Sequence, residues 1–200
     1  MPDPIRFYFD LSSPYGYFAA LKIDELAAGF GREVAWHPIM LGVAMKVTGS
    51  KPLALIPVKC DYVKHDWDRL ARFMNVSWKF PKNFPIATLA ASRAFYWLVD
   101  DNPLLAKRLV LTAYDTYFGH GRDITDAKTI ADIGEPLGID RNSLLSAVNE
   151  QVYKQRLKDE TSAAIDVGVF GSPYFIIDNE PFWGADRLWM IKRWLKSGGW

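Results

Sequence analysis

The chain has 200 residues, half of them hydrophobic and 14% aromatic, and its formal net charge is +1. This length fits one large domain or a small domain with an insertion, and the apolar share supports a core without disulfides. The balanced charge excludes the basic footprint of a nucleic-acid-binding protein and of a protein held at an anionic membrane surface.

The number of cysteines and the N-terminal sequence further narrow the class of protein. Cys60 is the single cysteine, which excludes an internal disulfide, a Cys-x-x-Cys redox pair and a multi-cysteine metal site. The three histidines are scattered, so we expect no metal site. Residues 1–4 lack the pattern of a signal peptide, and the longest apolar stretch, 85–99, contains Arg93 and is too short to span a bilayer. We therefore expect a cytoplasmic protein that binds neither membrane nor nucleic acid.

The first forty residues predict a β-α-β unit. Residues 5–9 are rich in strand-forming aromatic and β-branched side chains. A turn over 11–14 follows, and its proline suits the first turn of a helix. Apolar residues then recur at helical spacing until the glycines at 29–31, and 34–36 predict a second strand. The simplest arrangement is parallel and right-handed.

The middle of the chain predicts helices only. The expected helices are 62–73, 88–99, 104–117, 127–137 and, as one long helix or two shorter ones, 144–166.

The end of the chain returns to strands. Residues 174–177 predict a strand, 178–180 a turn, and 181–183 a short edge strand that tolerates its proline. Asp186 is placed to cap a last helix that runs to about residue 196. The expected fold is therefore α/β, a thioredoxin-like fold with a large all-helical insertion. The thioredoxin-like part would comprise 1–42 and 167–200, and the insertion 43–166.

Ser13 is the first candidate for chemistry. It lies where a strand leads into a helix, and backbone N–H groups at a helix N-terminus stabilise an anion such as a thiolate. Its hydroxyl can add one hydrogen bond. The alternative is an ordinary N-cap serine. Ser13 lacks the Gly-x-Ser-x-Gly motif of an acyl-transfer nucleophile.

Two later segments are the other candidates. Pro173 enters a strand, and a cis Ser172–Pro173 bond would leave the backbone of Ser172 free to pair with a peptide-like ligand; a trans proline that simply starts the strand is the alternative. Asp186 can cap its own helix or accept hydrogen bonds from a ligand ammonium. In a thioredoxin topology these segments and Ser13 meet at one end of the sheet.

With these motifs in place, the sequence resembles the 2-hydroxychromene-2-carboxylate isomerases and their relatives, the kappa-class glutathione transferases. The resemblance runs nearly the whole chain. Its marks are FYFDLSSPY at 7–15, MKVTGSKP at 45–52, PVK at 57–59, FPKNF at 80–84, VFGSP at 169–173 and FWGADRL at 182–188. The first and the last are specific in combination.

The resemblance implies glutathione as cofactor and assigns roles to eight residues. Ser13 would face the glutathione sulfur as the catalytic residue, and Ser172 would pair with the peptide backbone. Asp186 and Arg187 would hold the γ-glutamyl end. The remaining assignments are Ser50, at a position where the transferases usually have asparagine, as a glutathione contact, and Lys46, Lys59 and Asn83 near the substrate. The resemblance also implies a homodimer.

Three hypotheses of function remain open. The first is a glutathione-dependent isomerase that interconverts 2-hydroxychromene-2-carboxylate and trans-o-hydroxybenzylidenepyruvate in aromatic-compound degradation, with Ser13 stabilising the thiolate. The second is a kappa-like transferase that conjugates small electrophiles. The third is a glutathione-binding protein without catalysis. A disulfide oxidoreductase is disfavoured, because serine cannot form the mixed disulfide that exchange requires.

Overall fold

The computed structural model describes residues 3–200, and its centre is a mixed β-sheet. Within these residues the sheet has four strands in the order β2-β1-β3-β4. The strands are β1 (Ile5–Phe9), β2 (Val34–Pro38), β3 (Tyr174–Ile177) and β4 (Glu180–Trp183). β1 and β2 are parallel, whereas β3 is antiparallel to both β1 and β4. The predicted strands, including β4 at an edge, are confirmed.

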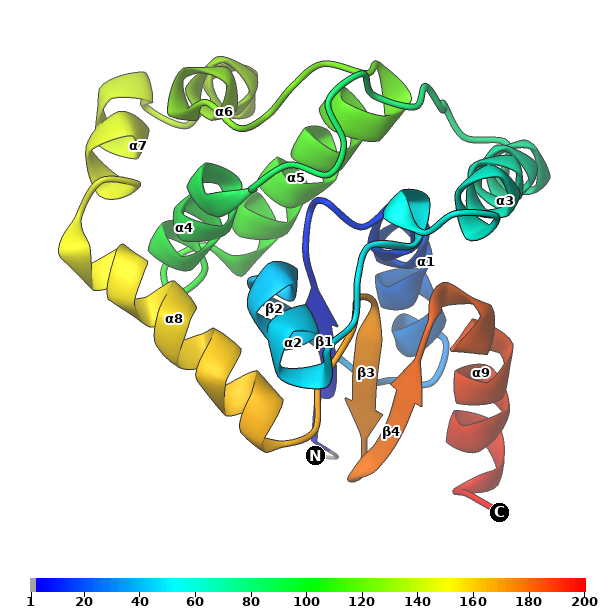
Figure 1. The fold of residues 1–200 in the computed structure, drawn as a ribbon. Coiled ribbons are helices and arrows are strands. Elements are labelled where there is room, and N and C mark those ends of the chain that lie inside the picture. The colour runs from blue at the N-terminus through cyan, green and yellow to red at the C-terminus, as the bar shows by residue number, and fades with distance from the viewer. Residues whose placement is uncertain (1–2) are drawn as a thin grey trace.

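Helices surround the sheet (Figure 1). α1 (Pro14–Ala28) connects β1 to β2, and α9 (Leu188–Ser197) follows β4. The helices between β2 and β3 are α2 (Leu41–Thr48), α3 (Lys59–Met74), α4 (Leu89–Leu98), α5 (Pro103–Tyr114), α6 (Ala127–Gly134), α7 (Arg141–Ala147) and α8 (Gln151–Asp166). Figure 1 shows α3 beside α1 on the right of the view and α4, α7 and α8 on the left. All predicted helices are present, and 144–166 is divided between two.

Two helix starts differ from what the sequence indicated. α2 was not predicted, because Met40 at its start provides no side-chain cap. The backbone N–H of Leu41 instead donates to Asp10 Oδ2 over 2.8 Å, a contact between residues far apart in sequence. The prediction that Asp186 caps the last helix is wrong, since Asp186 lies in a 3-10 turn and Arg187 occupies the cap position of α9.

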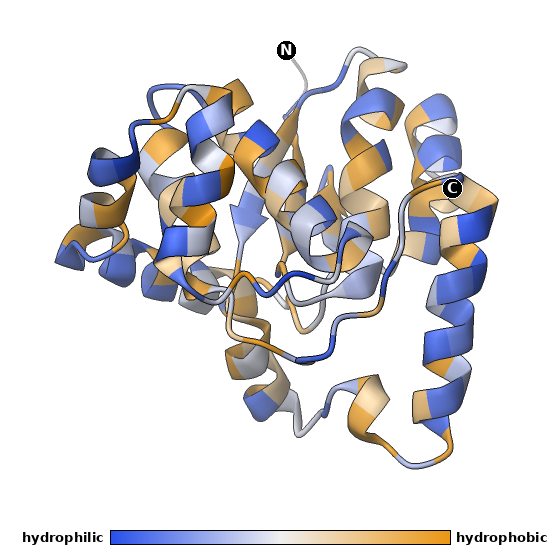
Figure 2. Cartoon of the chain, turned by 90° about the horizontal axis from the view of Figure 1, so that it is seen from above, coloured by the Kyte–Doolittle hydropathy of each residue, from blue (hydrophilic) through white to orange (hydrophobic). Residues whose placement is uncertain are grey.

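The two faces of the sheet are covered by different helices, because successive strand side chains point to opposite faces. The larger hydrophobic cluster joins alternate residues of β1 to α1 and α9, with Ile5, Phe7, Phe9, Ile23 and Ile191 among its members. The smaller cluster joins the opposite face to α8 through Tyr8, Tyr174, Ile176 and Ala164. Figure 2 shows both hydrophilic and hydrophobic colours on most helices, as expected of amphipathic helices that cover a core.

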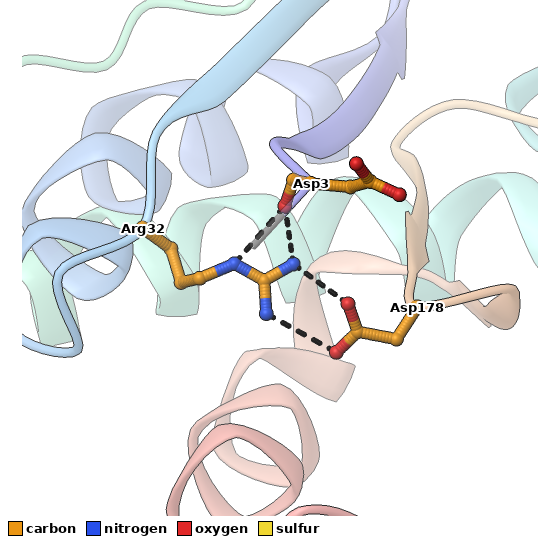
Figure 3. Close-up of polar contacts among 3 residues, drawn as sticks. All are labelled: Asp3, Arg32 and Asp178. Atoms are coloured by element: carbon orange, nitrogen blue, oxygen red, sulfur yellow. Dashed lines mark hydrogen bonds and ion pairs between the residues drawn. The ribbon is translucent and has the colours of Figure 1, made fainter. Parts of the chain in front are cut away.

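Arg32 joins three segments at the end of the sheet away from the start of α1 (Figure 3). Its guanidinium contacts both carboxylate oxygens of Asp178, in the β3–β4 turn, at 2.8 and 3.1 Å. Its Nε donates to the carbonyl oxygen of Asp3 at 3.0 Å. The side chain is only 9% exposed. Its hydrogen bonds link the start of the chain, the α1–β2 loop and the β3–β4 turn.

The hydropathy of the helices bears on membrane insertion. Within residues 3–200, every helix is too short or too polar to cross a bilayer.

Candidate active site

A cleft of about 1660 Å³ lies where α1 begins. Its walls come from the start of α1, the α2–α3 region, the loop before β3 and the start of α9. Seven of the eight predicted site residues line it, namely Ser13, Lys46, Ser50, Lys59, Ser172, Asp186 and Arg187. The fold thus brings residues more than 170 positions apart in sequence into one cleft.

Ser13 is the N-cap of α1 and a part of the cleft wall at the same time. Its Oγ accepts a hydrogen bond from the backbone N–H of Gly16 at 3.0 Å. The same hydroxyl donates to the carbonyl oxygen of Ser172 at 2.8 Å. The residue is 5% exposed. The N-cap interpretation is therefore confirmed, and the single hydroxyl proton is already engaged.

The loop before β3 is fixed from several directions. The Ser172–Pro173 bond is cis. The prediction that the Ser172 carbonyl is free is wrong, because its oxygen accepts a hydrogen bond from the Ser13 hydroxyl. Ser172 Oγ accepts the backbone N–H of Asp10 at 3.0 Å, and the N–H of Gly184 donates to the carbonyl of Pro173 at 3.0 Å. The loop is thereby tied to the ends of both β1 and β4.

Asp10 is a central residue of the site that sequence reasoning missed. It is 7% exposed and lines the cleft. Its Oδ1 accepts from the N–H of Ser12 at 2.8 Å and from the hydroxyl of Thr88 at 2.9 Å, while Oδ2 holds the start of α2. Burial of a carboxylate is tolerated when its oxygens are hydrogen-bonded in this way. The strand-end position of Asp10 gave no sign of these long-range contacts.

The edge of the cleft carries charges of both signs. Arg187 Nη1 and Asp186 Oδ2 are 2.6 Å apart, and their side chains are 44% and 73% exposed. Elsewhere in the lining, Ser50 Oγ accepts a hydrogen bond from Thr48 Oγ1 at 2.8 Å, and Lys46 is exposed near the end of α2.

Asn83 is the predicted site residue that does not line the cleft. Its side-chain amide donates to Asp123 Oδ2 at 3.0 Å, and its carbonyl accepts the Tyr117 hydroxyl at 2.6 Å. The Asn83 bond, together with bonds from Thr125, lowers the pKa of Asp123 below its ordinary value. In this structure Asn83 holds a loop together.

Gly16 limits the chemistry that the start of α1 can perform. Ser13 and Gly16 have the spacing of the two cysteines in a Cys-x-x-Cys pair. A Cβ at Gly16 would lie 2.6 Å from the hydroxyl oxygen of Tyr114, which is fully buried and bonded to the carbonyl of Asp10. The position therefore has no room for a second cysteine, and Ser13 cannot supply the first thiolate.

The sheet order, the α1 N-terminus in a cleft and the cis-proline loop facing it define a thioredoxin-like protein. The family model described as DSBA-like thioredoxin domain matches residues 4–196, and the chain belongs to this family.

Named relatives refine the comparison. The 2-hydroxychromene-2-carboxylate isomerase of Sphingobium xenophagum is 29% identical over 198 residues, 98% of this chain and 99% of the relative. Glutathione S-transferase kappa 1 of Caenorhabditis elegans is 23% identical and covers 94% of this chain and 88% of its own. A solved structure of 2-hydroxychromene-2-carboxylate isomerase superposes with a TM-score of 0.87 at 27% identity, covering 96% of this chain and 94% of the other. The resemblance noted from the sequence motifs is confirmed.

Proposed function

We propose that the protein is a glutathione-dependent isomerase that interconverts 2-hydroxychromene-2-carboxylate and trans-o-hydroxybenzylidenepyruvate in aromatic-compound degradation. The observation that carries the proposal is Ser13, at the N-terminus of α1, in a cleft large enough for a tripeptide and an aromatic substrate. The isomerase relatives, similar over nearly the whole chain, support the choice of reaction.

The groups that line the cleft fit glutathione chemically. A helix N-terminus suits the thiolate, because its free N–H groups and dipole favour negative charge. The adjacent Asp186 and Arg187 suit a γ-glutamyl end, which carries one ammonium and one carboxylate. The backbone of Ser172 suits the peptide part. Relatives named glutathione S-transferase kappa support the same ligand.

Ser13 must change its hydrogen-bond partner to act on a thiolate. Its proton is donated to the Ser172 carbonyl, and an amide N–H of a bound peptide can take over that carbonyl. The Ser13 hydroxyl is then free to donate to the sulfur, while Gly16 N–H continues to hold its oxygen. When bound, glutathione would supply a thiolate that adds to a conjugated carbon, permits rotation and leaves again. Ser13 thus stabilises a nucleophile and is not the nucleophile itself.

Lys46 and Lys59 would attract the carboxylate of the substrate. Both are exposed and line the cleft. Asn83, outside the cleft lining, would act only through the loop that it holds.

The test is turnover of 2-hydroxychromene-2-carboxylate with and without glutathione. We expect a requirement for glutathione and a loss on the order of 10²-fold in Ser13→Ala, as for removal of one preorganised hydrogen-bond donor. Ser12→Ala is the matched control and should stay near wild type. Full activity in Ser13→Ala, or turnover independent of glutathione, would contradict the proposal. A stable glutathione conjugate seen by mass spectrometry would favour the transferase instead, and binding without turnover the non-catalytic protein.

We also propose that the protein is a cytoplasmic homodimer, and that 43–166 is an insertion into a thioredoxin-like part formed by 1–42 and 167–200. The support is the family resemblance. Sedimentation equilibrium tests the dimer, and a monomer at micromolar concentration would contradict it.

A further inference from the structure

A polar group on the α3 wall of the cleft has no role in the function proposed so far. Asp66 and Tyr15 both line the cleft, and the Tyr15 hydroxyl donates to Asp66 Oδ2 at 2.7 Å. Arg69, one turn along α3, pairs with the other carboxylate oxygen. The Asp66 side chain is 19% exposed, so the carboxylate is held in place yet can be reached from the cleft.

Aromatic residues lie close to Asp66 on α1, on α3 and in the loop before α4. The ring of Trp67 packs against Tyr15, with centroids 6.0 Å apart, and against Phe84, with centroids 5.7 Å apart. Tyr62, a turn before Asp66, also lines the cleft. Trp67 is 2% exposed, and its indole N–H has no hydrogen-bond partner among the described residues. A carboxylate that can be reached from the cleft, beside aromatic side chains, is suited to a flat aromatic ligand that bears a hydroxyl group.

We propose that Asp66 and Tyr15 form a proton relay that opens the ring of 2-hydroxychromene-2-carboxylate, which is a cyclic hemiketal. This inference rests on the proposed isomerase function. The Asp66 carboxylate accepts the proton of the hemiketal hydroxyl, and the electrons of that O–H bond form the new carbonyl. The bond between the ketal carbon and the ring oxygen breaks, and its electrons stay on the ring oxygen. Tyr15 gives its proton to that oxygen, which becomes the phenol, and protonated Asp66 returns a proton to Tyr15.

The surroundings keep Tyr15 in the form that the relay requires. Burial, followed by the hydrogen bond to Asp66, raises the pKa of the Tyr15 hydroxyl above its ordinary value. The charges of Asp66 and Asp186 and the Tyr62 hydroxyl act in the same direction. Tyr15 is therefore neutral and a weaker acid than a free phenol, so it gives up its proton in concert with the return of a proton from Asp66. α1 and α3 contact each other, so the relay adjoins the helix that bears Ser13.

Calorimetric binding of two probes tests the recognition of the hydroxyl without glutathione or turnover. The probes are trans-2-hydroxycinnamate and trans-cinnamate, which differ only in the ring hydroxyl. We expect Tyr15→Phe to lose about fivefold in affinity for the hydroxylated probe and to bind cinnamate as wild type does, as for the loss of one hydrogen bond. Tyr153→Phe, on α8 and outside the cleft lining, is the control. Equal binding of both probes to wild type, or equal loss of both in Tyr15→Phe, would overturn the proposal.

Turnover of two substrates separates ring opening from rotation. The cyclic hemiketal needs both steps, whereas cis-benzylidenepyruvate, which lacks the hydroxyl, needs rotation only. We expect the activity of Asp66→Asn and of Tyr15→Phe to fall on the order of 10²-fold on the hemiketal and less than about threefold on the open substrate. Ser13→Ala should lose activity on both substrates. Equal losses on the two substrates in the Asp66 and Tyr15 variants would overturn the relay, whereas wild-type enzyme inactive on both would overturn the proposed function itself.

Discussion

At the scale of single residues, Ser13 combines a structural and a chemical role. Its oxygen caps α1 through Gly16, and its proton goes to Ser172. Removing the hydroxyl therefore affects stability as well as activity. We predict that Ser13→Ala lowers the free energy of unfolding by about 1–2 kcal/mol, as for loss of an N-cap side chain.

Urea denaturation checks this prediction. Ser12→Ala, which leaves both contacts of Ser13 in place, is the matched control and should change the free energy of unfolding by less than about 0.5 kcal/mol. Equal effects of the two variants would contradict the capping role. Because the predicted loss is small, Ser13→Ala should remain folded in an activity assay.

Gly16 makes a second prediction at this scale. An added Cβ would meet the Tyr114 hydroxyl at 2.6 Å, and this hydroxyl is held by the carbonyl of Asp10. Gly16→Ala should therefore destabilise the protein by about 1–3 kcal/mol, the usual cost of overpacking. The cost should shrink in a Tyr114→Phe background, where the clashing oxygen is gone. A double-mutant cycle measures this, and an identical cost in both backgrounds would contradict the steric explanation.

At the scale of elements, the sequence predicted the strands, α1 and most helices because each carries its own local signal. α2 is the exception. Its start is set by Asp10, which lies on another element and also holds Thr88. The relay of Tyr15 and Asp66 was missed for the same reason, since the two residues are 51 positions apart and lie on different helices. The positions of Ser13, Ser172 and Asp186 were predictable because strand ends and helix starts meet at one edge of this sheet.

The hydrogen bonds of Arg32 give a prediction for the stability of the loops that they connect. Lysine is a poor replacement, because only a planar guanidinium can bond both oxygens of Asp178 and the carbonyl of Asp3 at once. We predict that Arg32→Lys costs about 1–2 kcal/mol and speeds amide hydrogen exchange in the β3–β4 turn. Arg108→Lys, at an exposed position of α5, is the control. Unchanged exchange in that turn would contradict the role assigned to Arg32.

At the scale of the whole molecule, contacts join the sheet to the helices that lie between β2 and β3. One of them is a hydrogen bond between His37 of β2 and Glu160 of α8, with Nδ1 and Oε2 3.3 Å apart. The hydrogen bond from His37 lowers the pKa of Glu160 below its ordinary value of 4.5. A carboxyl with a lowered pKa stabilises the fold above its unfolded-state pKa, and this contribution is lost as the pH falls through the folded-state pKa.

We therefore predict that Glu160→Gln costs up to about 1 kcal/mol near pH 6 and nothing in acid well below the pKa of Glu160. The value is small because both side chains are about a third exposed or less. Free energies of unfolding measured across this pH range check the prediction. Glu33→Gln, at an exposed position just before β2, is the control. A wild-type-minus-variant difference that does not change with pH would contradict it.

The central claim concerns the whole cleft, that glutathione lies across it with its sulfur at Ser13. A crystal structure of the protein soaked with glutathione tests this most directly. The account predicts the sulfur within hydrogen-bonding reach of Ser13 Oγ, and the γ-glutamyl end at Asp186 and Arg187. A sulfur beyond reach of that hydroxyl, or a ligand bound outside the cleft, would contradict it.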